Sequence, residues 1–401
     1  MSTKRFSRHS RWLALVGAIT LVASGCATEK AAGGGDGDEV KVGVITSTSG
    51  LLSAYGKQFT EGFKAGIDYS TDGTGKVDGR KLDITFHDDA TDPAKATSAA
   101  TGLIGDGYKI ITGPVSSGVA VQVAPLAEQN NILFISGAAA TDAITGINKN
   151  TFRSGRQTYQ DVVTSQSIVG DLKGKKVVVF AQDYEFGQAN VAAVKAVLGD
   201  AGGAKVVPVL SPVDTSDFTP FARQVVDEKP DLVFVAWAGE TTNAMWKTLD
   251  QQGVFDDTSV VTGLADQATF DDFGPAATEI DFLSHYFAGA SKTAANEALI
   301  KSLKADGIKA DIFHNDGFVA AQMVVQAVKK GGGDDVAAMI DALEGWKFIG
   351  PKGEQTIRSE DHAMLQPMFQ ARLVKSGNSV VPELVDTLSP DTVAPPVVAA
   401  K

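Results

Sequence analysis

The sequence predicts an α/β protein with two doubly wound parallel-sheet lobes, and two observations support this prediction. Short apolar runs rich in β-branched residues, such as VKVGVIT, KLDITFHDD, YKIIT and NILFIS, alternate with segments whose apolar residues recur at helical spacing. Such alternation of strand and helix is typical of parallel sheets. The alternation starts again at KKVVVFAQD and continues through AKVVPVLSP, PDLVFVAWA and SVVTGL. The two halves share the same order of elements, but no sequence repeat is visible between them.

The first residues have the pattern of a bacterial secretory signal. MSTKRFSRHSR is basic, and the apolar WLALVGAITLVASG that follows ends in small residues before Cys26. This apolar core is shorter than the ~20 residues of a membrane-spanning helix. Cys26 is the only cysteine of the 401 residues, so no internal disulfide can form. ASGC resembles the lipobox of bacterial lipoproteins, with Ala23 where Leu or Val is more common, and this resemblance implies that Cys26 is acylated. An ordinary signal peptide followed by a stray cysteine is the alternative.

Composition limits the classes of partner. The Gly-rich, polar ATEKAAGGGDGDE is expected to be a flexible tether, and the folded body is expected to begin near Val40. Apolar residues make up 43% of the chain, and no run after the signal is long and uncharged enough to span a bilayer. The formal net charge of −12 argues against binding nucleic acid or anionic lipid through a basic surface. A small ligand in a local pocket stays possible.

The loops that follow the predicted strands are the candidate ligand site. In open parallel sheets, ligands bind at the carboxyl ends of the strands, and two facing sheets enclose a cleft there. GPVSSG, ISGAAAT, FAQDYEFG and VAWAGE all follow predicted strands. In GPVSSG, two hydroxyls lie where a helix presents unpaired N–H groups. They indicate either a helix cap or a receptor for a ligand carboxylate.

Several of these motifs, in this order, resemble the branched-chain amino-acid binding proteins, which are class I periplasmic solute-binding proteins of ABC transporters. The motifs are SGLLSAYG, GPVSSG, FISGAAATDAI, FRSGRQ, FAQDYEFGQA and HNDGFVAAQMVVQAV, and the likeness runs from about residue 40 to about residue 374. The resemblance implies the type I periplasmic binding protein fold, in which two lobes are joined by three crossings and close on the ligand by a hinge. The crossings are expected near residues 152–154, 286–288 and 350–362.

The resemblance also gives the expected domain boundaries. They are a lipoprotein signal peptide at 1–25, a tether at 26–39, an N-terminal lobe at 40–152 plus 287–350, a C-terminal lobe at 153–286 plus 351–390, and a tail at 391–401.

In the first lobe, the resemblance implies ligand contacts after three strands. Tyr55 matches the aromatic residue that covers the ligand, and Ser116 and Ser117 match the hydroxyl pair that holds its carboxylate. FISGAAAT matches a small pair followed by a threonine, which marks Ala139, Ala140 and Thr141. Three alanines precede the threonine here, so either Ala140 or Thr141 takes the hydroxyl position.

In the second lobe, Phe186 falls where the family often has tyrosine, which makes the wall more apolar. Trp237 ends the buried run DLVFVAW and is either a core residue or a cleft residue that covers the ligand. The family holds a ligand amine with an acid, for which Asp266 is the nearest candidate, although the position could align with Ala265 instead. Asp183 is a second candidate, or else a helix cap.

The sequence therefore predicts a monomeric, exported solute-binding lipoprotein anchored to the outer face of the cell membrane. Its expected ligand is a small amino acid or a related carboxylate or amide, delivered to the permease subunits of an ABC importer. A ligand sensor with a signalling partner and a secreted hydrolase are the alternatives. No cofactor, metal site, catalytic residue or nucleic-acid partner is expected, because the histidines lack zinc spacing and no GxSxG, Walker or strand-following GxGxxG motif occurs.

Overall fold

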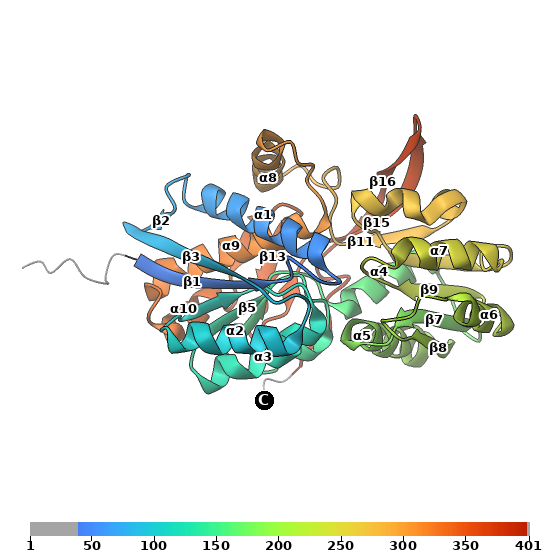
Figure 1. Ribbon diagram of the computed structural model, residues 1–401, viewed down its shortest axis with the longest axis horizontal. Helices are drawn as coiled ribbons and strands as arrows, with labels where there is room; N and C mark the ends of the chain where they lie inside the picture. Colours follow the sequence, from blue (N-terminus) through green and yellow to red (C-terminus); the bar gives the residue numbers. More distant parts are fainter. Residues whose placement is uncertain (1–38, 399–401) are drawn as a thin grey trace, which may run out of the picture. The chain divides into compact units, whose positions relative to one another are not determined.

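The computed structural model describes residues 39–398 (Figure 1). The predicted signal peptide, Cys26 and nearly all of the tether lie outside the described residues. The first sheet has the strand order β2-β3-β1-β4-β5-β6, and its pairs are parallel except for β2 with β3. Its strands are β1 (Glu39–Thr46), β2 (Lys76–Val77), β3 (Arg80–Asp88), β4 (Ile110–Thr112), β5 (Leu133–Ser136) and β6 (Thr151–Arg153).

Helices cover both faces of this sheet because alternate residues of its strands point to opposite sides. Val42 and Val44 of β1 belong to a core with α1, α9 and α10, whereas Ile45 faces a second core with α2 and α3. Gly43 lets Leu103 approach, since an added Cβ would lie 2.6 Å from the Leu103 Cδ1 atom. The elements of this lobe, here called the N-terminal lobe, are α1 (Ser53–Ser70), α2 (Pro93–Gly105), α3 (Ser117–Gln129), η1 (Asp142–Ile144), α8 (Ala294–Ala305), α9 (Ile312–Gly331) and α10 (Val336–Leu343).

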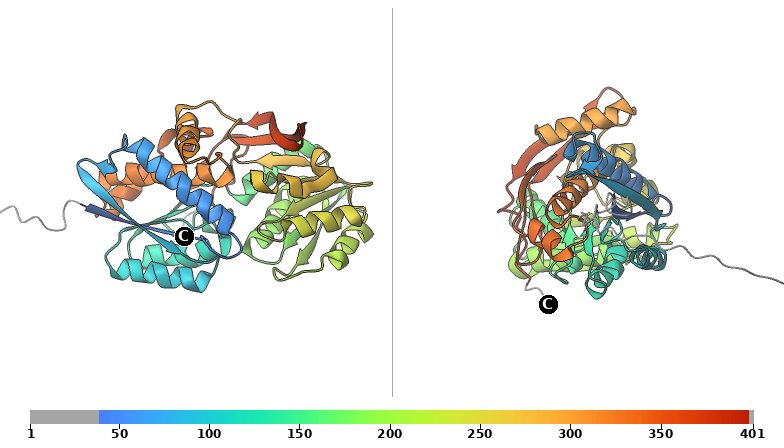
Figure 2. Two further views of the ribbon diagram at one scale, coloured as in Figure 1. Left: turned by 45° about the horizontal axis from the view of Figure 1, so that its top comes forward. Right: turned by 90° about the vertical axis from the view of Figure 1, so that its left-hand side faces the viewer.

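The second sheet has the order β16-β15-β11-β10-β9-β7-β8. It is parallel from β8 to β11, and the antiparallel hairpin of β15 and β16, red in Figure 2, extends its edge. Its strands are β7 (Lys176–Gln182), β8 (Lys205–Ser211), β9 (Leu232–Ala236), β10 (Ser259–Gly263), β11 (Asp281–Ser284), β15 (Met368–Ser376) and β16 (Ser379–Leu388). Helical elements again cover both faces of the sheet. This sheet and its helical elements are here called the C-terminal lobe. The helical elements are α4 (Thr158–Val169), α5 (Glu185–Val194), η2 (Lys195–Ala201), α6 (Thr219–Asp227), α7 (Thr242–Gln251) and η3 (Gln267–Thr278).

A small third sheet shifts one lobe boundary from its expected place. It consists of β12 (Lys347–Gly350), β13 (Gly353–Ile357) and β14 (Met364–Leu365). Ile357 and Met364 are fully buried in the same core cluster as Val319 of α9, so residues 351–365 pack with the N-terminal lobe. The sequence assigned these residues to the C-terminal lobe. The third crossing therefore falls between Leu365 and Met368, and not within 350–362.

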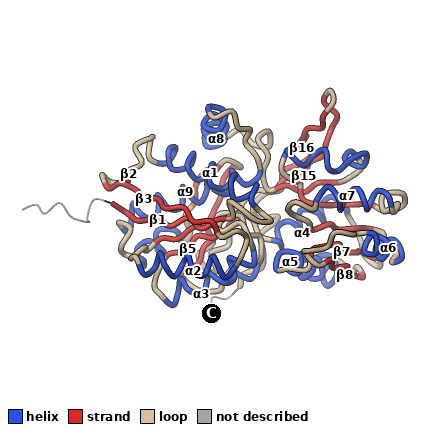
Figure 3. The backbone as a smooth tube through the Cα atoms, in the orientation of Figure 1, coloured by secondary structure: helices blue, strands red, loops and turns tan. Residues whose placement is uncertain are grey.

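The predicted fold class is confirmed: two lobes, each built on a mostly parallel sheet with helices on both faces (Figure 3). The first crossing links β6 to α4, and the second leaves β11. Within residues 39–398, no helix combines the length and apolarity required to cross a membrane.

Candidate ligand-binding site

The carboxyl ends of strands from both sheets surround a cavity of about 90 Å³. Turns after β4 and β5 form one wall, and the ends of β9, β10 and β11 form the opposite wall. Six aromatic residues contribute to the lining, namely Tyr55, Tyr184, Phe186, Phe234, Trp237 and Phe313. A concave space lined by aromatic side chains together with polar groups is typical of small-molecule sites.

Five of the residues predicted from sequence line this cavity. They are Tyr55, Ser117, Ala140, Phe186 and Trp237, and they come from both lobes. Each of these residues lies just after a strand or in the first turn of the helix that follows it. Ala265, the alternative to Asp266, also lines the cavity.

Tyr55 and Trp237 are held in place by other aromatic rings. The Tyr55 ring packs on Phe313 at a centroid distance of 4.3 Å, and burial raises the pKa of the Tyr55 phenol. The Trp237 ring contacts Phe180 and Phe218, and its Nε1 donates to the Thr241 Oγ1 at 3.0 Å. Trp237 therefore combines the two roles that the sequence left open, because it packs on the core of its lobe and also lines the cavity.

The two serines of GPVSSG differ in position. Ser117 lines the cavity, and its Oγ accepts a hydrogen bond from the Thr141 N–H at 3.3 Å. Ser116 is the N-cap residue of α3, but its side chain makes no capping bond and does not line the cavity. The geometry thus shows no side-chain cap at Ser116, and no residue within 39–398 accepts a hydrogen bond from the Ser117 hydroxyl.

Ser116, Ala139, Thr141 and Asp266 do not contribute to the lining. The Ala139 carbonyl accepts from Arg153, and the Thr141 hydroxyl donates to Glu185 of the other lobe at 2.7 Å. Asp266 is buried with its Oδ1 unpaired, and burial raises the pKa of its carboxyl group. Asp183, the other candidate acid, is exposed and accepts a hydrogen bond from Gln188.

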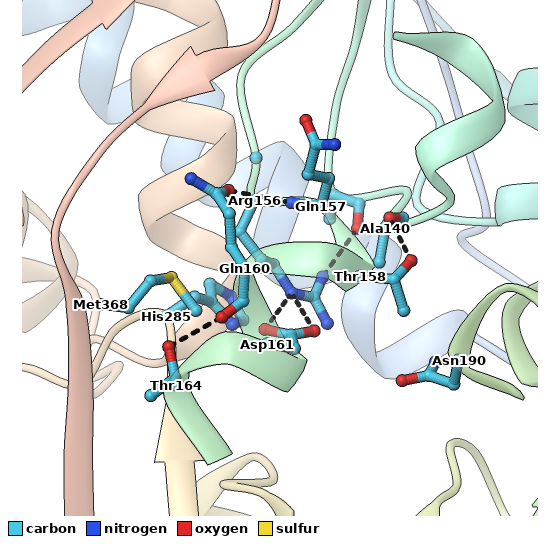
Figure 4. Close-up of polar contacts among 12 residues, drawn as sticks. Ala140, Arg156, Gln157, Thr158, Gln160, Asp161, Thr164, Asn190, His285 and Met368 are labelled. Atoms are coloured by element: carbon cyan, nitrogen blue, oxygen red, sulfur yellow. Dashed lines mark hydrogen bonds and ion pairs between the residues drawn. The ribbon is translucent and has the colours of Figure 1, made fainter. Parts of the chain in front are cut away.

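Arg156 and Asp161 are cavity residues that sequence reasoning missed. The Arg156 Nε lies 3.2 and 3.4 Å from the two Asp161 carboxylate oxygens, and its Nη1 donates to the Ala138 carbonyl at 3.1 Å (Figure 4). Burial raises the pKa of Asp161, and the positive charge of Arg156 opposes this shift. The motif FRSGRQ could have indicated this role, because Arg156 lies in the first crossing, between β6 and α4.

A second arginine of the same motif has a structural role. Arg153 is 1% exposed, and its three nitrogens donate to the carbonyls of Ala139, Thr141, Gly155 and Arg156 and to the Thr145 hydroxyl. These bonds tie the turn after β5 to the first crossing. Burial lowers the pKa of Arg153 to about 10, which leaves the guanidinium charged at neutral pH.

His285 also lines the cavity, at the second crossing. Its Nε2 lies 3.5 Å from the Asp316 Oδ2, and neither atom has a hydrogen-bond partner among the described residues. Burial lowers the pKa of His285 and raises that of Asp316, and it also lowers the pKa of the nearby Lys352. The crossings thus enclose buried ionisable groups beside the cavity.

The site has no features of a metal centre within residues 39–398. No group of three or more His, Cys, Asp or Glu side chains in that range is arranged to hold a metal ion. His285 has a single carboxylate neighbour, and Asp161 is occupied by Arg156. The arrangement can therefore bind and enclose a small molecule by aromatic contact, hydroxyl groups and one arginine.

Comparisons with known proteins agree with this geometry. The family model described as "Periplasmic binding protein" matches residues 39–378. A Leu/Ile/Val-binding protein homolog of Brucella melitensis is 26% identical over 335 residues, which are 82% of this chain and 90% of that protein.

Two solved structures extend the comparison. An ABC-type branched-chain amino acid transporter protein of Rhodopseudomonas palustris has 31% identity and a TM-score of 0.75, covering 90% of this chain and 100% of that one. A solute-binding protein from another strain, in complex with 3,4-dihydroxybenzoic acid, has 26% identity and a TM-score of 0.77, with 88% and 98% coverage. The match over residues 39–378, together with the two-lobed fold and the cavity between its sheets, shows that the chain belongs to the periplasmic binding protein family of solute-binding proteins.

Proposed function

We propose that this protein is the ligand-binding component of an ABC importer and that it binds a small aromatic carboxylate in the cavity between its lobes. The observation that carries the proposal is the cavity itself, in which six aromatic side chains surround a small space beside one arginine. Aromatic rings offer flat apolar contact to a planar ligand, and a guanidinium matches the geometry of a carboxylate. Solved relatives at 26% and 25% identity hold 3,4-dihydroxybenzoic acid and benzoate, which supports the same class here.

An amino acid is the second candidate, and Asp161 favours it. A zwitterion could place its carboxylate on Arg156 and its amine on Asp161, which lie side by side in the lining. The relatives named as Leu/Ile/Val-binding proteins support this candidate. Against it, Asp161 already shares both oxygens with Arg156, and Asp266 lies outside the lining.

The family is one of periplasmic solute-binding proteins rather than of enzymes, and membership implies export. Acylation of Cys26 would then hold the protein at the outer face of the membrane, close to the permease that receives the ligand. The basic start, the short apolar core and the sole cysteine support this part of the proposal.

A ligand screen followed by scattering tests the proposal. Purified protein is titrated by calorimetry with benzoate, 4-hydroxybenzoate, benzamide, leucine and phenylalanine. We expect the aromatic acids to bind more tightly than the amide and the amino acids, and small-angle scattering at saturation to show a smaller radius of gyration, because a ligand that prefers the closed form shifts the lobes toward it. Tight binding of leucine with no response to aromatic acids would support the second candidate. An unchanged radius of gyration would count against closure.

A further inference from the structure

We propose that Arg156 is the residue that binds the ligand's carboxylate, a role that the sequence assigned to the serines of GPVSSG. This inference rests on the proposed function and specifies its site. Arg156 lies between β6 and α4, and its side chain is 10% exposed. It lines the cavity, so the remaining exposed part of the guanidinium is available to a ligand.

The hydrogen bonds of Arg156 leave one nitrogen free. Nε is directed to Asp161 and Nη1 to the Ala138 carbonyl, while no described residue accepts from Nη2. In Figure 4, the dashed lines leave the guanidinium toward Asp161 and a backbone carbonyl, and the side facing Asn190 has none. A guanidinium has five N–H donors, so Nη2 and the second Nη1 proton can form the paired bonds that a carboxylate accepts.

Arg153 is an internal comparison for this assignment. It comes from the same motif and is also buried, but its Nε, Nη1 and Nη2 all donate to protein oxygens. A buried arginine that serves only the fold is therefore saturated in this protein. Arg156 is not, and the side of its guanidinium without a described partner faces Asn190, another residue of the cavity lining.

Asp161 fixes the orientation of Arg156 and, with the guanidinium, leaves little net charge at the pair. A bound carboxylate then brings an excess negative charge. The buried Arg153 guanidinium, whose positive charge acts on the neighbouring Asp142, opposes this excess. The pair thus holds a carboxylate by directed hydrogen bonds, and the site recognises an acid in preference to the corresponding amide.

The test compares an acid with its neutral analogue. Calorimetric titrations with benzoate and benzamide are made on the wild type, Arg156→Gln, Arg156→Lys and the control Arg223→Gln, whose side chain is exposed and bonds Gln252. Arg156→Gln removes hydrogen bonds between a charged group and the ligand. The loss of binding free energy should raise the dissociation constant for benzoate roughly ten- to a hundredfold. Benzamide should change little, and the control should match the wild type.

Arg156→Lys keeps the charge but loses the planar fork, and we expect an intermediate loss for benzoate. It also serves as the test if Arg156→Gln does not fold. An unchanged benzoate affinity in both variants, or equal losses for acid and amide, would overturn the role of Arg156 while the proposed function stands. Failure of the wild type to bind any aromatic acid would instead overturn the proposed function.

A separate observation concerns the end of the described chain. We infer that residues 389–398 form a fourth connection between the lobes and limit their opening. After β16 of the C-terminal lobe, Val393 is fully buried against Met368 and Leu388, with Val163 of α4 beside it. The following residues reach the N-terminal lobe.

There the segment binds a buried ion pair. The Arg358 Nε and Nη2 donate to the two carboxylate oxygens of Asp361 at 2.8 and 2.6 Å, and both side chains are mostly buried. The Arg358 Nη1 also donates to the Pro395 carbonyl at 2.7 Å, and the Val398 N–H donates to the Asp361 carboxylate at 3.0 Å. Arg358 and Asp361 belong to the loop after β13, which packs with the N-terminal lobe.

These contacts join the lobes outside the three crossings. Hinge opening that separates Val393 from Arg358 has to stretch a five-residue link from 394 to 398 or break its hydrogen bonds. The segment therefore acts as a strap that favours small opening angles, and its loss should populate wider ones.

Two truncations test the strap in the full-length protein. One ends at Thr392 and removes both contacts; the other ends at Val398, keeps every described contact and is the matched control. Spin labels on Lys95→Cys and Lys247→Cys, in a Cys26→Ala background, report the distance between α2 and α7, where both side chains are exposed. Without ligand, the shorter chain should show longer and broader distances than the control.

Val393→Asp releases the apolar anchor without shortening the chain, and it replaces the truncation if that variant does not fold. Distance distributions identical to the control in the truncated chain or in Val393→Asp would overturn the inference. A lowered melting temperature with unchanged distances would likewise assign the segment to stability alone.

Discussion

The Arg156 Nε and the Asp161 Oδ2 atoms lie 3.2 Å apart in the wall of the cavity, with both side chains at most 10% exposed. Breaking such a pair leaves an uncompensated buried charge. A substitution at Asp161 should therefore lower the stability of the protein without lowering its affinity for an aromatic acid.

Asp161→Asn should lower the free energy of unfolding by about 3 kcal/mol, because the Arg156 charge stays buried without its partner. The same change removes a negative charge beside the ligand, so the affinity for benzoate should rise or stay constant. An amino-acid ligand would behave in the opposite way, since its amine would lose Asp161. Urea unfolding and calorimetry measure the two quantities.

The exposed pair Arg372 and Glu383 provides the control for stability. Glu383→Gln should cost less than about 1 kcal/mol, because exposed ion pairs contribute little. Equal stability losses at the two pairs would show that burial of Arg156 is not the cause. A strong loss of benzoate affinity in Asp161→Asn would show that the orientation of Arg156 depends on the Asp161 charge, and it would contradict the expected gain from removing a negative charge beside the ligand.

Cys26 should become the lipidated N-terminus of the exported protein, because a basic start, a short apolar core and small residues precede the only cysteine. Intact-mass analysis of the membrane fraction should find a diacylated cysteine, and Cys26→Ala should release the protein from the membrane. A variant that stays bound to the membrane, or a native protein without the lipid mass, would contradict lipidation of Cys26 as the anchor.

His285 should make stability depend on pH. Burial lowers the pKa of its imidazole below the usual value of 6.5, with Arg156 and Lys352 adding to the shift. The unfolded chain therefore binds a proton first as the pH falls, so the stabilisation present above about pH 6.5 is lost below it. Between pH 7 and 5, the wild type should lose up to about 2 kcal/mol more than His285→Gln.

Urea denaturation at both pH values gives this difference directly. Asp316 faces His285 at 3.5 Å, and His314 also has a lowered pKa, so both contribute to the pH dependence of either protein. The comparison with His285→Gln removes these shared contributions. Parallel losses in the wild type and the variant would mean that His285 is protonated in the folded protein at pH 5.

The fold was predictable from sequence because parallel strands buried on both faces read as continuous apolar runs. VKVGVIT and DLVFVAW became β1 and β9 for this reason. The antiparallel additions were not predictable in the same way. β13 and β14 are short, and only the burial of Ile357 and Met364 beside α9 shows to which lobe they belong. Such non-local packing leaves no periodic signal in the sequence.

The residues of the site also differ in whether the sequence could predict them. Tyr55, Ser117 and Trp237 were expected at a site because the carboxyl ends of parallel strands mark ligand sites, and all three line the cavity. Arg156 was missed because an arginine in a loop is usually exposed. Its burial depends on Asp161 and on the Ala138 carbonyl, which lie 5 residues later and 18 residues earlier in the chain. The polar anchor of a ligand is thus harder to predict than the shape of its cavity.

Ser117→Ala and Ser116→Ala should separate the two serines that the sequence treated as a pair. The Ser117 hydroxyl accepts from the Thr141 N–H and keeps its proton for a ligand in the cavity, so its loss should raise the dissociation constant for benzoate about tenfold. Ser116 makes no capping bond and lies outside the lining, so Ser116→Ala should change neither affinity nor stability by more than about 0.5 kcal/mol. Calorimetry and melting temperatures of both variants are the measurements. A larger affinity loss at Ser116 would mean that the start of α3 turns toward the ligand on closure, and a fall in melting temperature there would restore Ser116 as a helix cap.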